Sequence, residues 1–192
     1  MSPRTTEQYD KLKKDRKNEI LDVALELFGN KGFTQTSISA IAKEAGISKG
    51  LMYNYFESKA DLLDGVIQHV DEDTMHFFAD IMVLEDANEV LVQLITRTGK
   101  FLKEKREYNT LITSLSLQKD VHSVVRDFAD KKMVEMMPFL ENLLKQQGFE
   151  NPEEEAVLFG AIIDGMSVQF LSTENEAYLN KTIQLLLKRY TV

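Results

Sequence analysis

The sequence predicts an all-α protein with a small N-terminal three-helix domain and a larger C-terminal helical domain. Apolar residues recur at helical spacing along nearly all of the 192 residues, and no stretch shows the alternation typical of strands. Capping residues, glycines and a few prolines divide this pattern into separate helices. The chain is long enough for one small module and one sizeable core.

The first helix is expected over residues 15–30, because Ile20, Ala24, Leu27 and Phe28 share one face and Gly32 can end it. Residues 1–14 are expected to form a flexible basic arm. A basic cluster lies there and just beyond, formed by Lys11, Lys13, Lys14, Arg16 and Lys17. Two interpretations stay open: the cluster binds DNA phosphates or a minor groove, or it is a solvated, frayed terminus.

Two short helices joined by a glycine turn are predicted between Gly32 and Lys59. Thr36 or Ser37 can cap the first, and Gly46 can end it by adopting a positive φ. Ser48 can cap the second. Their inward faces are assigned to Ile38, Ile41, Ala42 and Ala45, and to Leu51, Met52 and Tyr55.

This spacing fits either a helix-turn-helix that enters a DNA groove or an ordinary αα-hairpin. The hairpin explains the apolar pattern equally well. It does not explain why Lys49, Tyr53 and Asn54 are expected on a solvent-facing surface near Lys59. We therefore favour DNA binding, and a further helix that begins near Lys59 leads out of the motif.

Residues 15–64 resemble the DNA-binding domain of the TetR family of bacterial repressors. The resemblance rests on Ile20–Phe28 with Lys31–Phe33, Thr36–Ile38, Ile41–Ser48, and Tyr53–Phe56 with Lys59 and Leu62. It covers about a quarter of the chain. The family often has an aromatic residue and then a histidine after the first tyrosine, where this chain has Asn54 and Tyr55. The resemblance therefore predicts the mode of DNA binding but not the operator sequence.

Nine residues are predicted to contact double-stranded operator DNA. Ser37, Tyr53 and Lys59 are assigned to phosphates, and Ser39, Lys49, Gly50 and Asn54 to base edges. Ser48 and Tyr55 complete the set.

A net charge of −8 is unfavourable for binding DNA, but the charge is unevenly distributed along the chain. Residues 1–60 carry 10 Lys/Arg and 8 Asp/Glu, whereas the remainder carries 13 and 23. The acidic excess therefore lies outside the motif. The chain has no cysteine, no evident signal peptide and no expected membrane segment, which fits a cytoplasmic protein.

Residues 61–192 are predicted to form a C-terminal ligand-binding and dimerisation domain. Its first helix continues from Lys59 past Val70 and acts as a connector, because no Pro/Gly-rich linker separates the halves. The other helices are expected near residues 87–105, 111–117, 121–144, which contains Pro138, and 152–171, followed by a last helix that ends near Tyr190.

The helix from Ala156 to Leu171 is apolar on nearly all sides, so it should be buried on all sides. A core helix in a monomer and a two-fold dimer both satisfy this, and we favour the homodimer. TetR-like proteins also dimerise through their last two long helices, as the resemblance implies. The predicted interface is Phe159, Ile163, Met166, Phe170, Leu179, Ile183 and Leu186.

A pocket for a small apolar or amphipathic effector is expected among the C-terminal helices. Aromatic and methionine side chains are candidates for its wall because they adapt to varied ligands: Phe101, Phe128, Met133 and Met137. Polar candidates on otherwise apolar helices are Asn109, His122, Asp164 and Gln169. For each aromatic or methionine residue taken singly a plain core role is favoured, and each polar residue could equally be a hydrogen-bonded structural group.

No catalytic residue, metal site or cofactor is predicted. His69, Asp73 and His76 have metal-like spacing but are interpreted as surface residues, and phosphate-binding glycine loops are absent. The predicted function is transcriptional repression relieved from a palindromic operator by a small molecule. A DNA-binding adaptor controlled by a protein partner is the alternative, and a helical enzyme or carrier with an accidental motif is the third.

Overall fold

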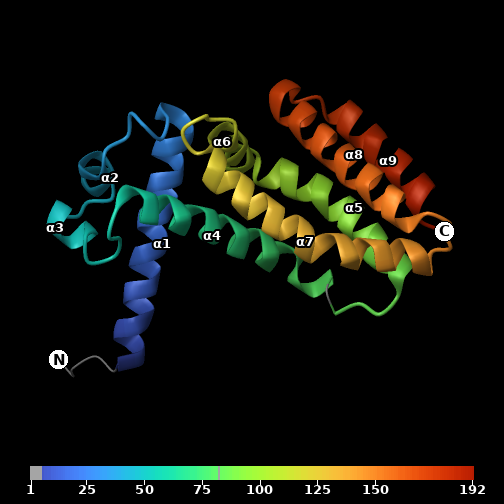
Figure 1. The fold of residues 1–192 in the computed structure, drawn as a ribbon, viewed down its shortest axis with the longest axis horizontal. Helices are drawn as coiled ribbons and strands as arrows, with labels where there is room; N and C mark the ends of the chain where they lie inside the picture. Colours follow the sequence, from blue (N-terminus) through green and yellow to red (C-terminus); the bar gives the residue numbers. More distant parts are fainter. Residues whose placement is uncertain (1–5, 82) are drawn as a thin grey trace. The chain divides into compact units, whose positions relative to one another are not determined.

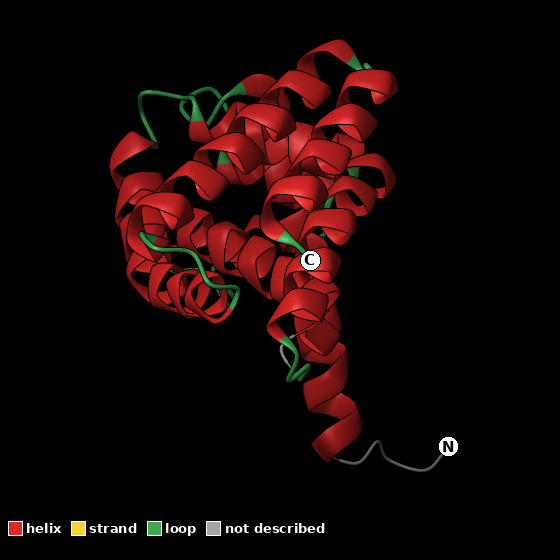
Figure 2. Cartoon of the chain, turned by 90° about the vertical axis from the view of Figure 1, so that its right-hand side faces the viewer, coloured by secondary structure: helices red, strands yellow, loops and turns green. Residues whose placement is uncertain are grey.

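The computed structural model describes residues 6–81 and 83–192, and these residues form helices and loops without strands (Figures 1 and 2). The all-α prediction is confirmed. In chain order the elements are α1 (Thr6–Lys31), α2 (Ile38–Glu44), α3 (Lys49–Met52), α4 (Lys59–Phe78), the 3₁₀ turn η1 (Ala79–Ile81), α5 (Ala87–Glu104), α6 (Arg106–Ser116), α7 (His122–Gln146), α8 (Pro152–Thr173) and α9 (Glu176–Tyr190).

The chain divides into two compact units. The N-terminal unit contains the described residues up to Asp73 together with residues 111–125. The C-terminal unit contains residues 74–110 and 126–192. The division falls inside α4, α6 and α7, whereas the sequence placed it at residues 60/61. Sequence periodicity missed residues 111–125 as part of the N-terminal unit, because their contacts lie about 85 positions earlier in the chain.

The N-terminal unit is built around α1, whose inner face meets α2, α3 and α4. The fully buried side chains there include Ile20, Phe28, Ile41, Met52 and Leu62. This core is the one that the apolar spacing predicted. α1 begins at Thr6, however, so residues 6–14 are helical and not part of a flexible arm. Their described side chains are exposed.

The turn between α2 and α3 has the geometry expected of its glycine. Gly46 has φ 66°, and its N–H donates to Lys43 O at 3.1 Å. The next N–H, from Ile47, donates to Ala42 O at 2.9 Å, so two carbonyls at the end of α2 are satisfied. Arg16 donates to Ala45 O at 3.0 Å. This member of the basic cluster therefore fixes the end of α2.

The loop after α6 belongs to the N-terminal unit. Gln118 accepts from Phe33 N–H at 2.8 Å and donates to Phe28 O at 2.9 Å. Ser114 donates to Gly29 O at 2.8 Å, and Val121 is fully buried. Residues 114–121 are thereby anchored against the end of α1 and the segment that precedes α2.

In the C-terminal unit α5 packs against α8 and α9. The shared core includes Leu91, Ile95, Phe159, Leu179 and Tyr190. A Cβ at Gly99 would lie 2.2 Å from Ile183 Cδ1, so the Ile183 side chain on α9 fills the space beside Gly99 and would have to move if α5 carried a side chain there.

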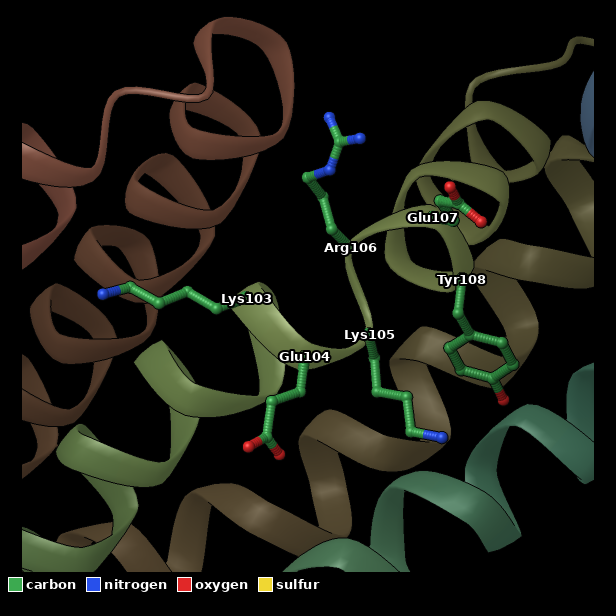
Figure 3. A pocket seen from close by; sticks show the side chains of 6 residues that line it. All are labelled: Lys103, Glu104, Lys105, Arg106, Glu107 and Tyr108. Carbon is green, nitrogen blue, oxygen red and sulfur yellow. The ribbon is translucent and has the colours of Figure 1, made fainter.

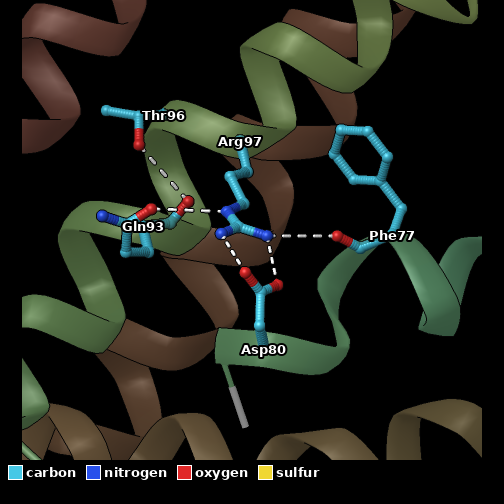
Figure 4. A network of polar contacts seen from close by, with 5 residues as sticks. All are labelled: Phe77, Asp80, Gln93, Thr96 and Arg97. Atoms are coloured by element: carbon cyan, nitrogen blue, oxygen red, sulfur yellow. Dashed lines mark hydrogen bonds and ion pairs between the residues drawn. The ribbon is translucent and has the colours of Figure 1, made fainter. Parts of the chain in front are cut away.

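A polar network joins η1 to α5 (Figure 4). The Arg97 guanidinium binds both carboxylate oxygens of Asp80 and donates to Phe77 O at 3.3 Å. Its Nε donates to Gln93 Oε1 at 3.3 Å. The Arg97 hydrogen bonds are the main reason that the pKa of Asp80 is lowered. The network fixes the chain direction where α4 ends.

The dimer residues predicted from sequence lie mainly in the core of a single chain. Five of the seven are buried there: Phe159, Met166, Phe170, Leu179 and Leu186. Ile163 and Ile183 are half-buried against the same core. The five buried residues therefore have little surface left for a second copy, and the interface on this stripe stays a prediction.

A different face of α8 and α9 is exposed and apolar. Val157 is 64% exposed, Val168 53% and Leu185 54%, and the small residues Ala161 and Gly165 lie on the same side of α8 as the valines. Among the described helices α8 alone is long and apolar enough to span a membrane, judged by length and composition. Only 22% of its most apolar window is buried, so much of its apolar surface has no partner within the chain.

Candidate nucleic-acid interface

Two serines cap the helices of the motif. Ser37 Oγ accepts from Ala40 N–H, and Ser48 Oγ accepts from Leu51 N–H, each at 3.1 Å. Each hydroxyl still has its own hydrogen to donate. Both side chains are exposed, so each cap can also bind a phosphate oxygen.

Thr36 has a structural role, which resolves the choice of cap left open by the sequence. Its side chain is 3% exposed, and its hydroxyl lies 2.8 Å from Gly32 O and 3.2 Å from Leu27 O. It therefore holds the segment before α2 against the end of α1, while Ser37 points outward as the cap.

An open groove of ≈ 360 Å³ joins the two ends of the motif. Five of the nine predicted DNA contacts line it: Ser37, Ser39, Lys49, Tyr53 and Lys59. The remaining lining residues are Thr34, Gln35, Thr36 and Ile38. Hydroxyls, two lysines and a phenol thus surround one groove, and these are the groups that bind phosphate oxygens of DNA.

Three of the four predicted base-reading residues lie in α3 or directly after it, and the fourth, Ser39, lies on α2. Lys49, Gly50 and Asn54 are exposed, and Tyr53 is 48% exposed. Met52 is fully buried, as expected, but Leu51 is 39% exposed and does not face inward. Its N–H is used by the Ser48 cap, and its side chain adds an apolar contact surface beside Asn54.

Tyr55 is half-buried, with its ring centroid 6.5 Å from that of Phe56. It is less accessible than Tyr53. Of the two tyrosines, Tyr53 is therefore better placed for DNA.

Lys59 lies at the start of α4, partly shielded from water. Its Nζ donates to Thr34 O at 3.3 Å and lies 4.3 Å from the centroid of the Phe33 ring. Burial lowers the pKa of Lys59, and the negative charge of Asp120 partly opposes this.

Ser58 and Asp61 cap α4. Ser58 Oγ accepts from Asp61 N–H at 3.1 Å, and Asp61 accepts from Glu57 N–H at 2.8 Å.

Sequence analysis missed two residues at this end of the groove. Thr34 lines it, and Asp120, in the loop after α6, accepts from Thr34 N–H at 2.8 Å and from the Thr34 hydroxyl. These hydrogen bonds are the main reason that the pKa of Asp120 is lowered. No local sequence signal connects positions so far apart.

The motif matches a known family of DNA-binding domains. Residues 20–66 match the family model described as bacterial regulatory proteins of the tetR family. Residues 20–66 therefore form a DNA-binding domain of the tetR type.

Relatives of this chain are transcriptional regulators. The regulator LuxR of Vibrio harveyi is 25% identical over 184 residues, which cover 90% of this chain and 87% of that one. The regulator AcrR of Shigella flexneri is 42% identical over 52 residues, 27% of this chain and 24% of its own. The chain is accordingly a DNA-binding transcriptional regulator.

The structural likeness extends through both units of the chain. A crystal structure of FadR from Bacillus subtilis in complex with stearoyl-CoA superimposes with a TM-score of 0.70 at 22% identity. The match covers 88% of this chain and 96% of that one. At this identity the likeness shows the fold alone.

The predicted effector residues do not line either of the two described grooves together. Phe101 is 8% exposed, and its ring centroid lies 4.8 Å from that of Phe77 and 5.8 Å from that of Phe78. Asn109 donates to Lys105 O at 2.9 Å and to Phe101 O at 3.4 Å, so it satisfies the end of α5.

The predicted effector-binding residues on α7 and α8 differ in how exposed they are to solvent. Met133 is 64% exposed, Phe128 is half-buried, and Met137 packs against the core. Asp164 is exposed on α8, although partial burial raises its pKa, and Gln169 Oε1 is buried without a hydrogen-bond partner among the described atoms. The side chain of His122 lies outside the described part.

A second open groove lies in the C-terminal unit where α5 meets α6 (Figure 3). Its ≈ 380 Å³ are lined by Lys103 through Tyr108, of which five are charged. Lys103 pairs with Glu176 at 3.1 Å, and Arg106 pairs with Glu174. The groove is polar, and it contains none of the predicted effector residues.

Proposed function

We propose that this regulator is a homodimeric repressor that binds a palindromic operator and is released from it by a small-molecule effector. The observation that carries the operator-binding part is the groove formed by Thr34–Ser39, Lys49, Tyr53 and Lys59 beside the exposed face of α3. A groove lined with donors beside an exposed short helix fits a phosphate backbone next to a major groove.

The contacts divide into two classes. Ser37, Tyr53 and Lys59 position the phosphates, and Ser48 is well placed to join them because its hydroxyl caps α3. Lys49, Gly50 and Asn54, with Ser39, face the base edges. The amide of Asn54 and the ammonium of Lys49 can discriminate bases, because they offer hydrogen bonds to the major-groove edge.

Support for the homodimer comes from the exposed apolar face of α8 and α9. Val157, Val168 and Leu185 are each more than half exposed, and Ala161 and Gly165 allow close helix approach between them. Apolar surface of this kind needs a partner in water. A two-fold axis through it would present two copies of α3 to two half-sites.

Support for effector control is less local. The FadR neighbour was crystallised with stearoyl-CoA, an amphipathic ligand. In this chain the Phe77, Phe78 and Phe101 rings and the buried Gln169 Oε1 are the groups that suit a ligand with apolar and polar parts. We propose that such a ligand binds in the C-terminal unit and that the protein acts in the cytoplasm.

The decisive experiment is a gel-retardation assay on the DNA that flanks the coding region. We expect a discrete complex on one palindromic segment, competed far better by that segment than by shuffled DNA of equal length. Affinity should fall steeply with salt, since phosphate contacts release counterions. Candidate acyl compounds should dissociate the complex. Equal competition by shuffled DNA would reject operator recognition.

A further inference from the structure

One end of the groove already holds an anion supplied by the chain. Asp120 Oδ2 accepts hydrogen bonds from the backbone N–H of Thr34, at 2.8 Å, and from the Thr34 hydroxyl. Lys59 donates to the carbonyl of the same residue at 3.3 Å. A carboxylate and an ammonium group therefore hold Thr34 from opposite ends of its backbone.

The donors that Asp120 occupies are those that a phosphate requires. A backbone N–H, a hydroxyl and a nearby ammonium are common ligands of DNA phosphate oxygens. Carboxylate and phosphate oxygens accept hydrogen bonds in the same way. Thr34 and Lys59 both line the groove that we assign to the DNA backbone.

We propose that the Thr34–Lys59 end of the groove is a phosphate-binding site and that Asp120 occupies it as an intramolecular counter-anion in the DNA-free protein. This inference rests on the proposed DNA contact along the groove. A phosphate that binds there meets the negative charge of Asp120 and must displace it or tolerate the repulsion. Asp120 therefore weakens DNA binding.

The loop that carries Asp120 is positioned independently of this carboxylate. Gln118 bonds to Phe28 O and Phe33 N–H, and Val121 is fully buried. Asp120 itself is exposed. Changing its charge should therefore leave the loop in place, so charge can be separated from folding.

The loop also lies between two helices that continue into the C-terminal unit. α6 begins there at Arg106, and α7 continues into it after Val125. A rearrangement of either helix would move Asp120 toward or away from Thr34. The occupancy of the phosphate site is thus open to regulation from the C-terminal unit.

The test compares Asp120→Asn with the wild type by fluorescence anisotropy on a labelled duplex over a series of salt concentrations. Asparagine still accepts the Thr34 hydrogen bonds but carries no charge. We expect about tenfold tighter binding at low salt, because one like-charge repulsion is removed. We also expect a plot of log affinity against log salt that is steeper by about 0.9, the value for one additional phosphate contact.

Two variants serve as controls. Asp120→Glu keeps the charge and should bind DNA much as the wild type does. Asp127→Asn removes one charge from an exposed position on α7 and should leave the salt slope unchanged. Thermal unfolding of each variant checks that the fold is retained. Wild-type or weaker binding by a folded Asp120→Asn, with an unchanged slope, would overturn the proposal.

Each titration is run on the selected operator and on a shuffled duplex. Phosphate contacts do not depend on sequence, so the Asp120 effect should appear on both. If the wild type prefers neither duplex, operator recognition is rejected. The ratio of the DNA affinities of Asp120→Asn and wild type still tests the role of Asp120 in that case. If the wild type prefers the operator and Asp120→Asn gains nothing, only the Asp120 proposal fails.

Discussion

Single side chains in the N-terminal unit serve both the fold and the interface. Ser37 and Ser48 accept backbone N–H groups at the starts of α2 and α3, yet both hydroxyls face solvent. Losing such a cap costs about 1 kcal/mol in stability. Alanine substitutions at these serines would therefore mix folding and binding effects. The side chains of Tyr53 and Asn54 do not cap a helix, so substitutions there report on DNA binding without the loss of a cap.

Tyr53→Phe and Asn54→Ala should affect DNA binding in different ways. Removal of the Tyr53 hydroxyl takes away one phosphate hydrogen bond of about 1 kcal/mol, so affinity should fall about fivefold on every duplex. Asn54→Ala should instead relax the preference at one base pair by about 1–3 kcal/mol. Competition titrations against operators with single substitutions measure both effects. A uniform loss for Asn54→Ala would contradict its assignment to the bases.

His69 is a buried titratable residue that the sequence assigned to the surface. It is 7% exposed, and its Nε2 lies 2.9 Å from Asp22 Oδ1 on α1 and 3.9 Å from Asp73 Oδ2 on α4. The hydrogen bond to Asp22 is the main reason that its pKa is raised, with Asp73 and Glu72 adding to the effect against burial. The protonated form joins α1 to α4.

A raised folded-state pKa makes the His69 contribution depend on pH. The stabilisation is complete below the unfolded-state value, about 6.5, and is lost as pH rises through the higher folded-state pKa. His69→Gln should therefore lower the melting temperature most at acidic pH, with a smaller difference from the wild type at alkaline pH. Asp22→Asn should show the same trend. A difference between wild type and His69→Gln that grows with pH would contradict this.

The sequence predicted residues whose roles depend on near neighbours. Ser37, Gly46 and Ser48 could be assigned because caps and turns are set by residues within three or four positions. Asp120 and His69 could not, since their partners Thr34 and Asp22 lie 86 and 47 positions away. The residues that flank Asp120 and His69 in the sequence give no sign of these two contacts.

At the scale of elements, α8 shows what periodicity leaves undecided. The helix is apolar on nearly all sides, so two stripes were available and the sequence did not show which packs within the chain. The structure turns the larger residues Phe159, Met166 and Phe170 inward and leaves Val157 and Val168 outside. Bulky side chains fill a core, whereas small ones permit close approach of a second helix. Side-chain size is a signal that periodicity alone does not use.

Two substitutions on α8 separate the interface from the core. Val168→Glu places a charge on the exposed face and should give a folded monomer, because only the contact with a second copy is lost. Phe170→Glu should unfold or precipitate the protein, since even Phe→Ala in a core costs about 3–5 kcal/mol. Analytical ultracentrifugation and circular dichroism distinguish these results. A wild-type dimer that survives Val168→Glu would place the interface elsewhere.

At the scale of the whole molecule, charge and connectivity separate two tasks. Residues 1–60, which contain the groove, carry a small basic excess, and the acidic excess lies in the remaining sequence. The helices α4, α6 and α7 each have residues in both units, so no flexible linker isolates one unit from the other. A ligand that changes any of these helices in the C-terminal unit therefore acts on chain that continues into the DNA-binding unit.

Thermodynamic linkage makes effector control testable without knowing the motion. If a ligand weakens operator binding, operator must weaken ligand binding by the same factor. A coupling of about 3 kcal/mol corresponds to about 150-fold. Calorimetric titration of an acyl compound into free protein and into the operator complex should show that loss of affinity. Phe101→Leu, which keeps an apolar side chain in the core, should weaken the ligand in both titrations while leaving operator affinity in the absence of ligand unchanged. Equal ligand affinity with and without operator would mean that the compound is not an effector, and control by a protein partner would then become the favoured mechanism.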